Sequence, residues 1–199
     1  VQRATYDYFR LGGQAAVVTG SGTGIGRATA IMLADLGARV MVCDIEKDSA
    51  RKVADEIAAR GGEAVWNKCD VTNLEEIRDT VQKTAEAFGT IDILVNNAAG
   101  FGGGKTFDKM DYEEWDRLIR INLTGAYMFT NEVLPIMVEK QHGKICMVSS
   151  GAALGYDFSD PHYAASKAGM IGLAKELSQE LAKHRINVNV LGTGLTDTR

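Results

Sequence analysis

Tyr163 and Lys167 have side chains that could move a proton together, and they stand four residues apart. On an α-helix this spacing places the phenol and the ammonium group on the same face. The pKa of a free tyrosine is about 10, and a neighbouring cation lowers it by favouring the phenolate. Such a tyrosine can donate a proton to a carbonyl or accept one from an alcohol. The same spacing is also typical of a pair of side chains at the protein surface. Whether Tyr163 and Lys167 act in catalysis therefore depends on where they lie in the fold.

A glycine-rich turn near the N-terminus could hold the phosphates of a dinucleotide. The segment 19–26 reads TGSGTGIG, between a short apolar run at 15–19 and a helical pattern at 27–36. Glycines at such a place let the backbone approach a pyrophosphate, and the N–H groups and helix dipole hold its negative charge. The residues of this turn predicted to bind a cofactor are Gly20, Ser21, Thr23, Gly24, Ile25 and Gly26.

Asp44 ends the second apolar run, about 20 residues after the glycine turn, where an acid can bind the ribose of a dinucleotide. A carboxylate accepts hydrogen bonds from the two ribose hydroxyls and repels a 2′-phosphate. No lysine or arginine occurs at 21–23 to attract that phosphate. NAD is therefore favoured over NADP. Arg39 and Lys47 are close in sequence, so the use of both cofactors stays open.

The elements that would position these residues alternate along the chain. Strands are predicted at 15–19, 39–43, from 64 onward, 91–95, 145–148 and 186–191. Helices are predicted at 27–36, 48–60, from Asn73 to about 88, 112–140 and 162–183. Pro135 falls inside the long helical region and is expected to bend or divide it.

Most of the predicted strands are continuous apolar runs, which are typical of strands buried on both faces. Strict alternation with helices then predicts a fold of the α/β class, a doubly wound (Rossmann-type) parallel sheet with helices on both faces. We expect a single dinucleotide-binding and catalytic domain over residues 1–199. Ligands bind such sheets at the carboxyl ends of the strands. Tyr163 opens the helix after the fifth strand, so it should lie at that edge.

With these elements in place, the chain resembles the short-chain dehydrogenase/reductase family over essentially its whole length. Six elements carry the resemblance, in the same order and at similar spacing. They are the glycine turn at 19–26, Asp70 with Val71, the segment 96–98, Asn122, Ser150, and Tyr163 with Lys167. The order and spacing of six elements make the resemblance specific.

The resemblance implies catalytic roles for four side chains. Tyr163 would be the general acid/base, and Lys167 would lower the tyrosine pKa and bind the nicotinamide ribose. Ser150 would orient and polarise the substrate oxygen, a role for which its neighbour Ser149 is the weaker choice. Asn122 would position Lys167 through a water molecule.

The resemblance also implies cofactor contacts beyond the glycine turn and Asp44. Asp70 and Val71 would hold the adenine ring, and Asn97 and Ala98 would contact the cofactor after the fourth strand. Thr198 matches a threonine expected to contact the nicotinamide carboxamide. Tyr163 and Lys167 would complete the cofactor-binding set.

The sequence departs from the family pattern at three places. An extra alanine, Ala99, precedes the glycine after the asparagine pair, and Phe101 and three glycines follow, which could reshape the loop beside the substrate. Thr193 stands where the family usually has proline. Because the family generally continues past the point matching Arg199, we expect the segment that covers the substrate and a last strand to be absent from this chain.

Composition excludes several other classes of protein. The net charge is -4 and the pI about 5.4, without the basic stripe of a nucleic-acid binder. No apolar run is long enough to span a membrane. Cys43, Cys69 and Cys146 are too scattered for disulfides or a metal cluster, and the three histidines lack ligand spacing, so we predict no metal. Buried thiols of this kind suit a cytoplasmic protein.

The sequence thus predicts an NAD-dependent oxidoreductase that interconverts a secondary alcohol and a ketone by hydride transfer. Two alternatives stay open: a 3-ketoacyl-thioester reductase that prefers NADPH, and a dinucleotide-binding subunit with little turnover. The predicted partner is a small alcohol or ketone, with neither nucleic acid nor membrane. The resemblance further implies a homo-oligomer, a tetramer or a dimer.

Overall fold

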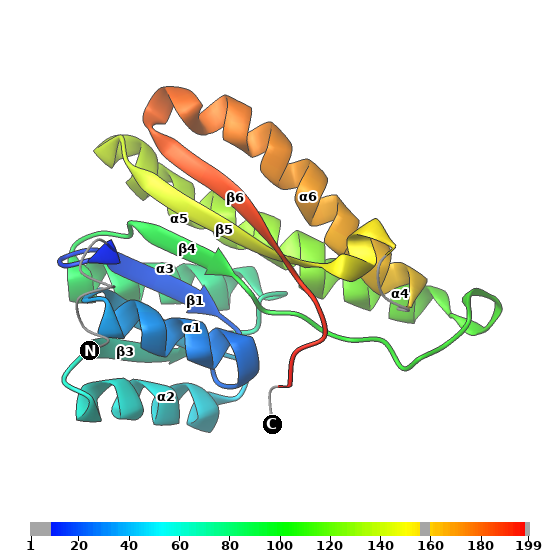
Figure 1. Ribbon diagram of the computed structural model, residues 1–199, viewed down its shortest axis with the longest axis horizontal. Helices are drawn as coiled ribbons and strands as arrows, with labels where there is room; N and C mark the ends of the chain where they lie inside the picture. Colours follow the sequence, from blue (N-terminus) through cyan, green and yellow to red (C-terminus); the bar gives the residue numbers. More distant parts are fainter. Residues whose placement is uncertain (1–8, 156–159, 198–199) are drawn as a thin grey trace.

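The computed structural model describes residues 9–155 and 160–197. Six parallel strands form one sheet in the order β3-β2-β1-β4-β5-β6, as Figure 1 shows. The strands are β1 (Ala15–Thr19), β2 (Arg39–Asp44), β3 (Glu63–Lys68), β4 (Ile93–Asn96), β5 (Gly143–Ser150) and β6 (Ile186–Thr193). The order reverses between β1 and β4, and a crevice for a ligand forms at such a reversal.

The helices cover both faces of this sheet. They are α1 (Gly24–Asp35), α2 (Lys47–Ala59), α3 (Leu74–Phe88), α4 (Tyr112–Ile119), α5 (Gly125–Lys140) and α6 (Pro161–Leu181). Alanines and aliphatic residues of α1 and α2 form one buried cluster with β1, β2 and β4. Residues of α3, α5 and α6 form a second cluster on the other face. The predicted doubly wound α/β sheet is therefore confirmed.

Local sequence explains how individual elements begin. All five residues of β1 are buried, as the continuous apolar run of a central strand predicts. Asn73 caps α3, because its side-chain oxygen accepts hydrogen bonds from the N–H groups of Glu75 and Glu76. Such a cap contributes about 1 kcal/mol to helix stability. The predicted helix from Asn73 to about Phe88 is thus confirmed.

The long helical region is divided, but not at the residue that the sequence indicated. A π-helical segment, η4 (Arg120–Thr124), separates α4 from α5. Pro135 lies inside α5 without ending it, so of the two expected effects, a bend or a division, the division does not occur at this proline. Proline removes only one intrahelical hydrogen bond, whereas a π segment changes the helical register and is frequent at functional sites.

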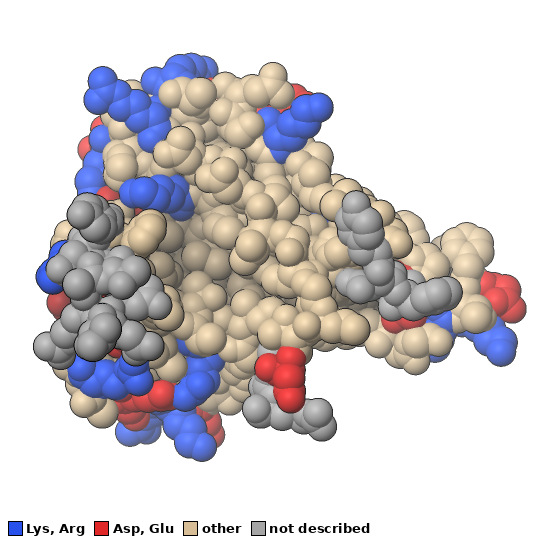
Figure 2. Space-filling view, viewed as in Figure 1, with Lys and Arg blue, Asp and Glu red and all other residues tan. Residues whose placement is uncertain are grey.

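A loop at 97–111 joins β4 to α4 and extends beyond the sheet, next to α4 and the start of α6 (Figure 1). Charged side chains of both signs lie mainly around the margin of the view in Figure 2, and few occur in the middle of that face. Among the described residues, no helix is both long and apolar enough to cross a membrane.

Candidate active site

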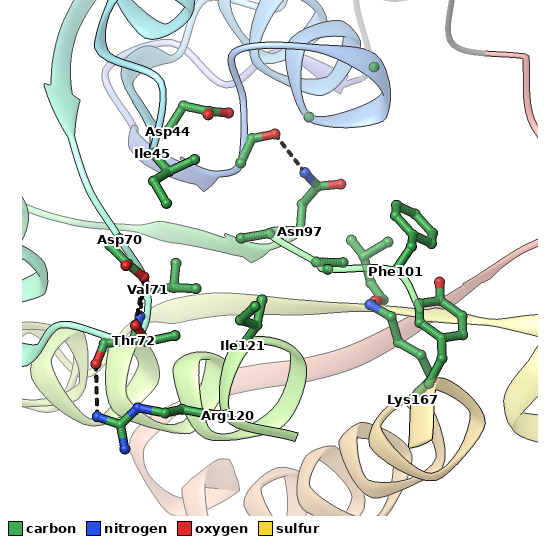
Figure 3. A pocket seen from close by; sticks show the side chains of 18 of the residues that line it. Asp44, Ile45, Asp70, Val71, Thr72, Asn97, Phe101, Arg120, Ile121 and Lys167 are labelled. Atoms are coloured by element: carbon green, nitrogen blue, oxygen red, sulfur yellow. Dashed lines mark hydrogen bonds between the residues drawn. The ribbon is translucent and has the colours of Figure 1, made fainter. Parts of the chain in front are cut away.

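A cavity of about 920 Å³ lies at the carboxyl ends of the strands. Figure 3 shows Asp44, Asp70 and Val71 on one side of it and Phe101 and Lys167 on the other. The predicted site residues that line it are Gly20, Thr23, Gly24, Ile25, Gly26, Asp44, Asp70, Val71, Asn97, Ala98, Tyr163 and Lys167. Most residues that the sequence singled out therefore share one cavity.

The glycine turn packs so tightly that side chains would not fit. A Cβ on Gly26 would lie 2.2 Å from the carbonyl oxygen of Gly20 and 2.5 Å from Asn97 Nδ2. Gly20 has a φ of +61°, and a Cβ there would meet Ala98 Cα at 2.7 Å. Asn97 in turn donates to the carbonyl oxygens of Thr19 and Gly20. The turn is thus held against the loop after β4.

The N-terminus of α1 fits the pyrophosphate of a dinucleotide. Thr23 is its N-cap residue, and no side chain of the described residues caps it. The first turn of α1 also contains no acidic residue. The first N–H groups of a helix have no partner within the helix, and its dipole places positive charge there. The turn therefore presents donors to an anion, with no carboxylate to repel it.

Ser21, which the sequence predicts to contact the cofactor, is not among the residues that line the cavity. Its side chain is fully buried, and its hydroxyl donates to the carbonyl oxygen of Val18 at 2.6 Å. The Ser21 hydroxyl oxygen in turn accepts from the backbone N–H of Cys43 at 3.1 Å. The hydroxyl thus joins β1 to β2 and holds the turn from beneath, because a short polar side chain here satisfies two buried backbone groups.

Asp44 lies at the end of β2 and faces the cavity. Its Oδ2 accepts a hydrogen bond from the N–H of Gly22 at 2.8 Å, and its Oδ1 accepts from the N–H of Glu46 at 3.0 Å. These bonds fix the carboxylate beside the glycine turn. A carboxylate has about four lone-pair sites, so acceptors remain for ribose hydroxyls.

Asp70 and Val71 follow β3 and border the cavity opposite the glycine turn. Asp70 Oδ1 accepts from both the N–H and the hydroxyl of Thr72, each at 2.8 Å. Val71 packs against the start of α5, where a Cβ on Gly125 would lie 2.9 Å from the Val71 carbonyl oxygen. A glycine after the π segment therefore allows α5 to approach this wall of the cavity.

Tyr163 and Lys167 come from the first turns of α6 and border the same cavity. The Nζ of Lys167 lies 5.7 Å from the centre of the Tyr163 ring. Lys167 is only 2% exposed, and its Nζ donates to the Val148 carbonyl oxygen at 2.7 Å. Burial lowers the pKa of Lys167 to about 8, because desolvation disfavours the charged form.

The two serines at the end of β5 are used differently. Ser149 lines the cavity, but its hydroxyl donates to the Lys167 carbonyl oxygen at 2.8 Å. Ser150 is buried at the start of a 3₁₀ turn, and its Oγ accepts from the N–H of Ala152 at 3.2 Å. Its hydroxyl hydrogen is therefore not used in that bond. Ser150 is not among the residues that line the cavity.

Asn122 lies in the π segment, fully buried, and joins two other elements. Its Oδ1 accepts from the N–H of Gly100 at 2.8 Å, and its Nδ2 donates to the Gly100 carbonyl oxygen at 3.2 Å. The Nδ2 also donates to Ser166 Oγ at 3.0 Å. The amide thus fixes the loop after β4 relative to α6, one residue before Lys167.

Comparison with known proteins agrees with this geometry. The model of the short chain dehydrogenase family matches residues 14–199. The chain is 36% identical over 189 residues to a 3-oxoacyl-[acyl-carrier-protein] reductase of Thermotoga maritima, covering 95% of this chain and 76% of the relative. It is 37% identical over 193 residues to the 7alpha-hydroxysteroid dehydrogenase of Escherichia coli, covering 96% and 75%. The chain belongs to the short-chain dehydrogenase family.

Solved structures of short-chain dehydrogenases have the same fold. The crystal structure of a putative short-chain alcohol dehydrogenase from Sinorhizobium meliloti superposes with a TM-score of 0.91 at 32% identity. The match covers 96% of this chain and 75% of that one. As a member of this family the chain is an oxidoreductase that interconverts an alcohol and a carbonyl compound.

Some residues around the cavity of this short-chain dehydrogenase were not predicted from sequence. Ile45, Cys69, Thr72, Phe101, Arg120 and Ile121 all line it. Several of them neighbour predicted residues, since Ile45 follows Asp44 and Ile121 precedes Asn122, but adjacency alone does not show which side chain faces a ligand. The predicted nicotinamide contact Thr198 lies outside the described residues.

Proposed function

We propose that this short-chain dehydrogenase uses NAD to interconvert a secondary alcohol and a ketone, with Tyr163 as the general acid/base. One observation carries the proposal. The glycine turn and Asp44 line the same cavity as Tyr163 and Lys167. A cofactor held by the turn and a substrate held at the tyrosine would therefore share one enclosed space.

The residues that line the cavity indicate which groups would hold the cofactor. The N–H groups at the start of α1 would bind the pyrophosphate, and Asp44 would accept hydrogen bonds from the adenine ribose. Asp70 and Val71 would border the adenine, while Asn97 and Ala98 hold the loop behind the turn. When bound, NAD supplies the acceptor and donor of the hydride.

Tyr163 would take the proton of an alcohol, or return it to a ketone. The ammonium group of Lys167, 5.7 Å from the centre of the Tyr163 ring, would stabilise the phenolate that forms when the tyrosine gives up its proton. Ser150 would donate a hydrogen bond to the substrate oxygen, because the hydroxyl of Ser149 is already used by the Lys167 carbonyl. Asn122 would support Lys167 by fixing the neighbouring residue of α6.

The substitution Tyr163→Phe tests this role, because it removes the hydroxyl and keeps the ring. We expect kcat with NAD and a panel of secondary alcohols to fall by at least about 100-fold, the lower end of general acid–base contributions. The dissociation constant of NADH should change little. Tyr112→Phe is the matched control, since Tyr112 is exposed at the start of α4. Full turnover by Tyr163→Phe would refute the assignment.

A second candidate is a reductase of 3-oxoacyl thioesters that prefers NADPH. The 36% identity to 3-oxoacyl-[acyl-carrier-protein] reductases favours it. Asp44 opposes it, because its carboxylate borders the cavity where a 2′-phosphate would be repelled. Measured dissociation constants decide the point: the first proposal requires NADH to bind more tightly than NADPH. Tighter binding of NADPH, with reduction of an acetoacetyl thioester, would establish the second candidate.

We also propose a homo-oligomer, a dimer or a tetramer, in the cytoplasm. On α5, Tyr127 is 54% exposed, so part of this helix is open to contact with a second copy of the chain. Light scattering coupled to size-exclusion chromatography would give the mass, and a monomer at micromolar concentration would refute the oligomer.

A further inference from the structure

Phe101 lies next to Tyr163, but none of the roles described above is assigned to this aromatic side chain. Its ring is stacked on the ring of Tyr163, with centroids 5.3 Å apart and an angle of 23° between the planes. Phe101 also lines the cavity and is 71% exposed. Part of the ring therefore borders the cavity, and most of its surface is accessible to solvent.

The stacking leaves the hydroxyl group of Tyr163 accessible to a substrate. A stacked neighbour covers the face of a phenol ring, whereas the hydroxyl group lies in the ring plane at its edge. A substrate oxygen can therefore meet the hydroxyl while the group beside the reacting carbon approaches Phe101. Phe101 thus forms one wall of the space next to the reacting centre.

The backbone on both sides of Phe101 is fixed. On one side, Gly100 exchanges two hydrogen bonds with the side chain of Asn122. On the other side, the N–H of Gly104 donates to Asp160 Oδ2 at 3.2 Å. These contacts tie the loop to the π segment and to the start of α6, the helix that carries Tyr163.

Gly102 allows this close approach. A Cβ at this position would lie 1.9 Å from Asp160 Oδ2 and 2.5 Å from His162 Cε1. A larger residue here would displace the side chains of Asp160 and His162, or the loop itself. Gly102 therefore serves a packing function, since it lets the loop lie close to the start of α6.

We propose that Phe101 determines substrate specificity by selecting ketones and alcohols with a planar aromatic or conjugated group next to the reacting carbon. Such a group can pack against the open part of the Phe101 ring while its oxygen meets Tyr163. Pairs of aromatic rings are worth about 0.5–1.5 kcal/mol beyond the area that they bury. This corresponds to a preference of about 2- to 12-fold in kcat/KM. The inference rests on the proposed role of Tyr163.

The test compares reduction of acetophenone, cyclohexyl methyl ketone and 2-butanone by the full chain with NADH. The substitution Phe101→Leu keeps an apolar side chain and removes the aromatic ring. We expect it to lower the ratio of kcat/KM for acetophenone to that for cyclohexyl methyl ketone by about 2- to 12-fold. Phe101→Tyr should keep the ratio, and the dissociation constant of NADH should stay within about twofold.

Phe107→Leu is the matched control, because Phe107 is in the same loop, is 74% exposed and does not line the cavity. It should leave the ratio unchanged. An unchanged ratio in Phe101→Leu, or an equal fall for all three ketones, would overturn the inference.

Two further outcomes separate this inference from the proposed function. If Tyr163→Phe is inactive and Phe101→Leu leaves the ratio unchanged, the proposed function stands and the inference fails. If the wild-type protein reduces none of the ketones, calorimetric titration of its NADH complex gives their affinities. A preference for acetophenone that Phe101→Leu removes would still support the inference, and no binding of acetophenone would refute it.

Discussion

Lys167→Met should change how the stability of the protein depends on pH. In the folded protein, burial lowers the pKa of Lys167 from 10.5 to about 8. Below pH 8 the lysine is charged in both the folded and the unfolded chain, so the full cost of burying the charge lowers the free energy of unfolding. Between pH 8 and 10.5 the unfolded chain binds more protons than the folded one, and stability therefore rises with pH.

The magnitude follows from the difference between the two pKa values. Each pKa unit corresponds to about 1.4 kcal/mol, so burial of the charge costs about 3 kcal/mol at pH 7. About 2.5 kcal/mol of this is regained by pH 10, because the folded chain has by then lost the proton. Methionine is similar in length and has no charge. At pH 7, Lys167→Met should be more stable by about 2 kcal/mol, after subtraction of about 1 kcal/mol for the lost hydrogen bond to Val148.

Urea unfolding at pH 7 and pH 10, without a nucleotide, measures these free energies. The advantage of Lys167→Met over the wild type should shrink by about 2.5 kcal/mol between the two pH values. Lys175→Met is the control, because Lys175 is an exposed lysine on the same helix. Its difference from the wild type should be nearly constant. If the wild type and Lys167→Met changed in parallel with pH, the account of a buried, charged lysine would be wrong.

Three further substitutions test the framework of the site. Gly26→Ala should raise the dissociation constant of NADH at least about tenfold, since its Cβ would clash with the Gly20 carbonyl oxygen at 2.2 Å; unchanged binding in a fluorescence titration would contradict this. Ser150→Ala should lower kcat about 100-fold. Ser149→Ala should instead lower the free energy of unfolding by about 1 kcal/mol. If urea unfolding showed the loss of stability for Ser150→Ala, and kinetics showed the loss of kcat for Ser149→Ala, the roles assigned to the two serines would have to be exchanged.

Local sequence was sufficient to predict the order of the strands and helices. The five buried residues of β1 form one apolar run, and the cap of α3 depends on Asn73 and two residues that follow it. Signals of this kind lie within a few residues of the structure that they determine. The alternation of strands and helices, with right-handed crossovers, then permits few topologies.

Features that depend on distant contacts could not be predicted. The π segment is stabilised where Asn122 bonds to Gly100 and to Ser166, which are 22 and 44 residues away. The inward orientation of Ser21 depends on its bond to Cys43 on the next strand. The stacking of Phe101 on Tyr163 likewise joins the loop after β4 to the first turn of α6. Residue type gives no indication of such contacts before the strands are aligned.

Both the side chain and the backbone of Lys167 bind the start of α6 to the sheet. Lys167 donates from its side chain to Val148 on β5, and its carbonyl oxygen accepts from Ser149 on the same strand. Asn122 holds the neighbouring Ser166 from the π segment. Because all of these bonds are made within the protein, they hold the start of α6 in place without a contact from the substrate. Specificity can therefore vary through the loop at 97–111 while the reaction stays the same.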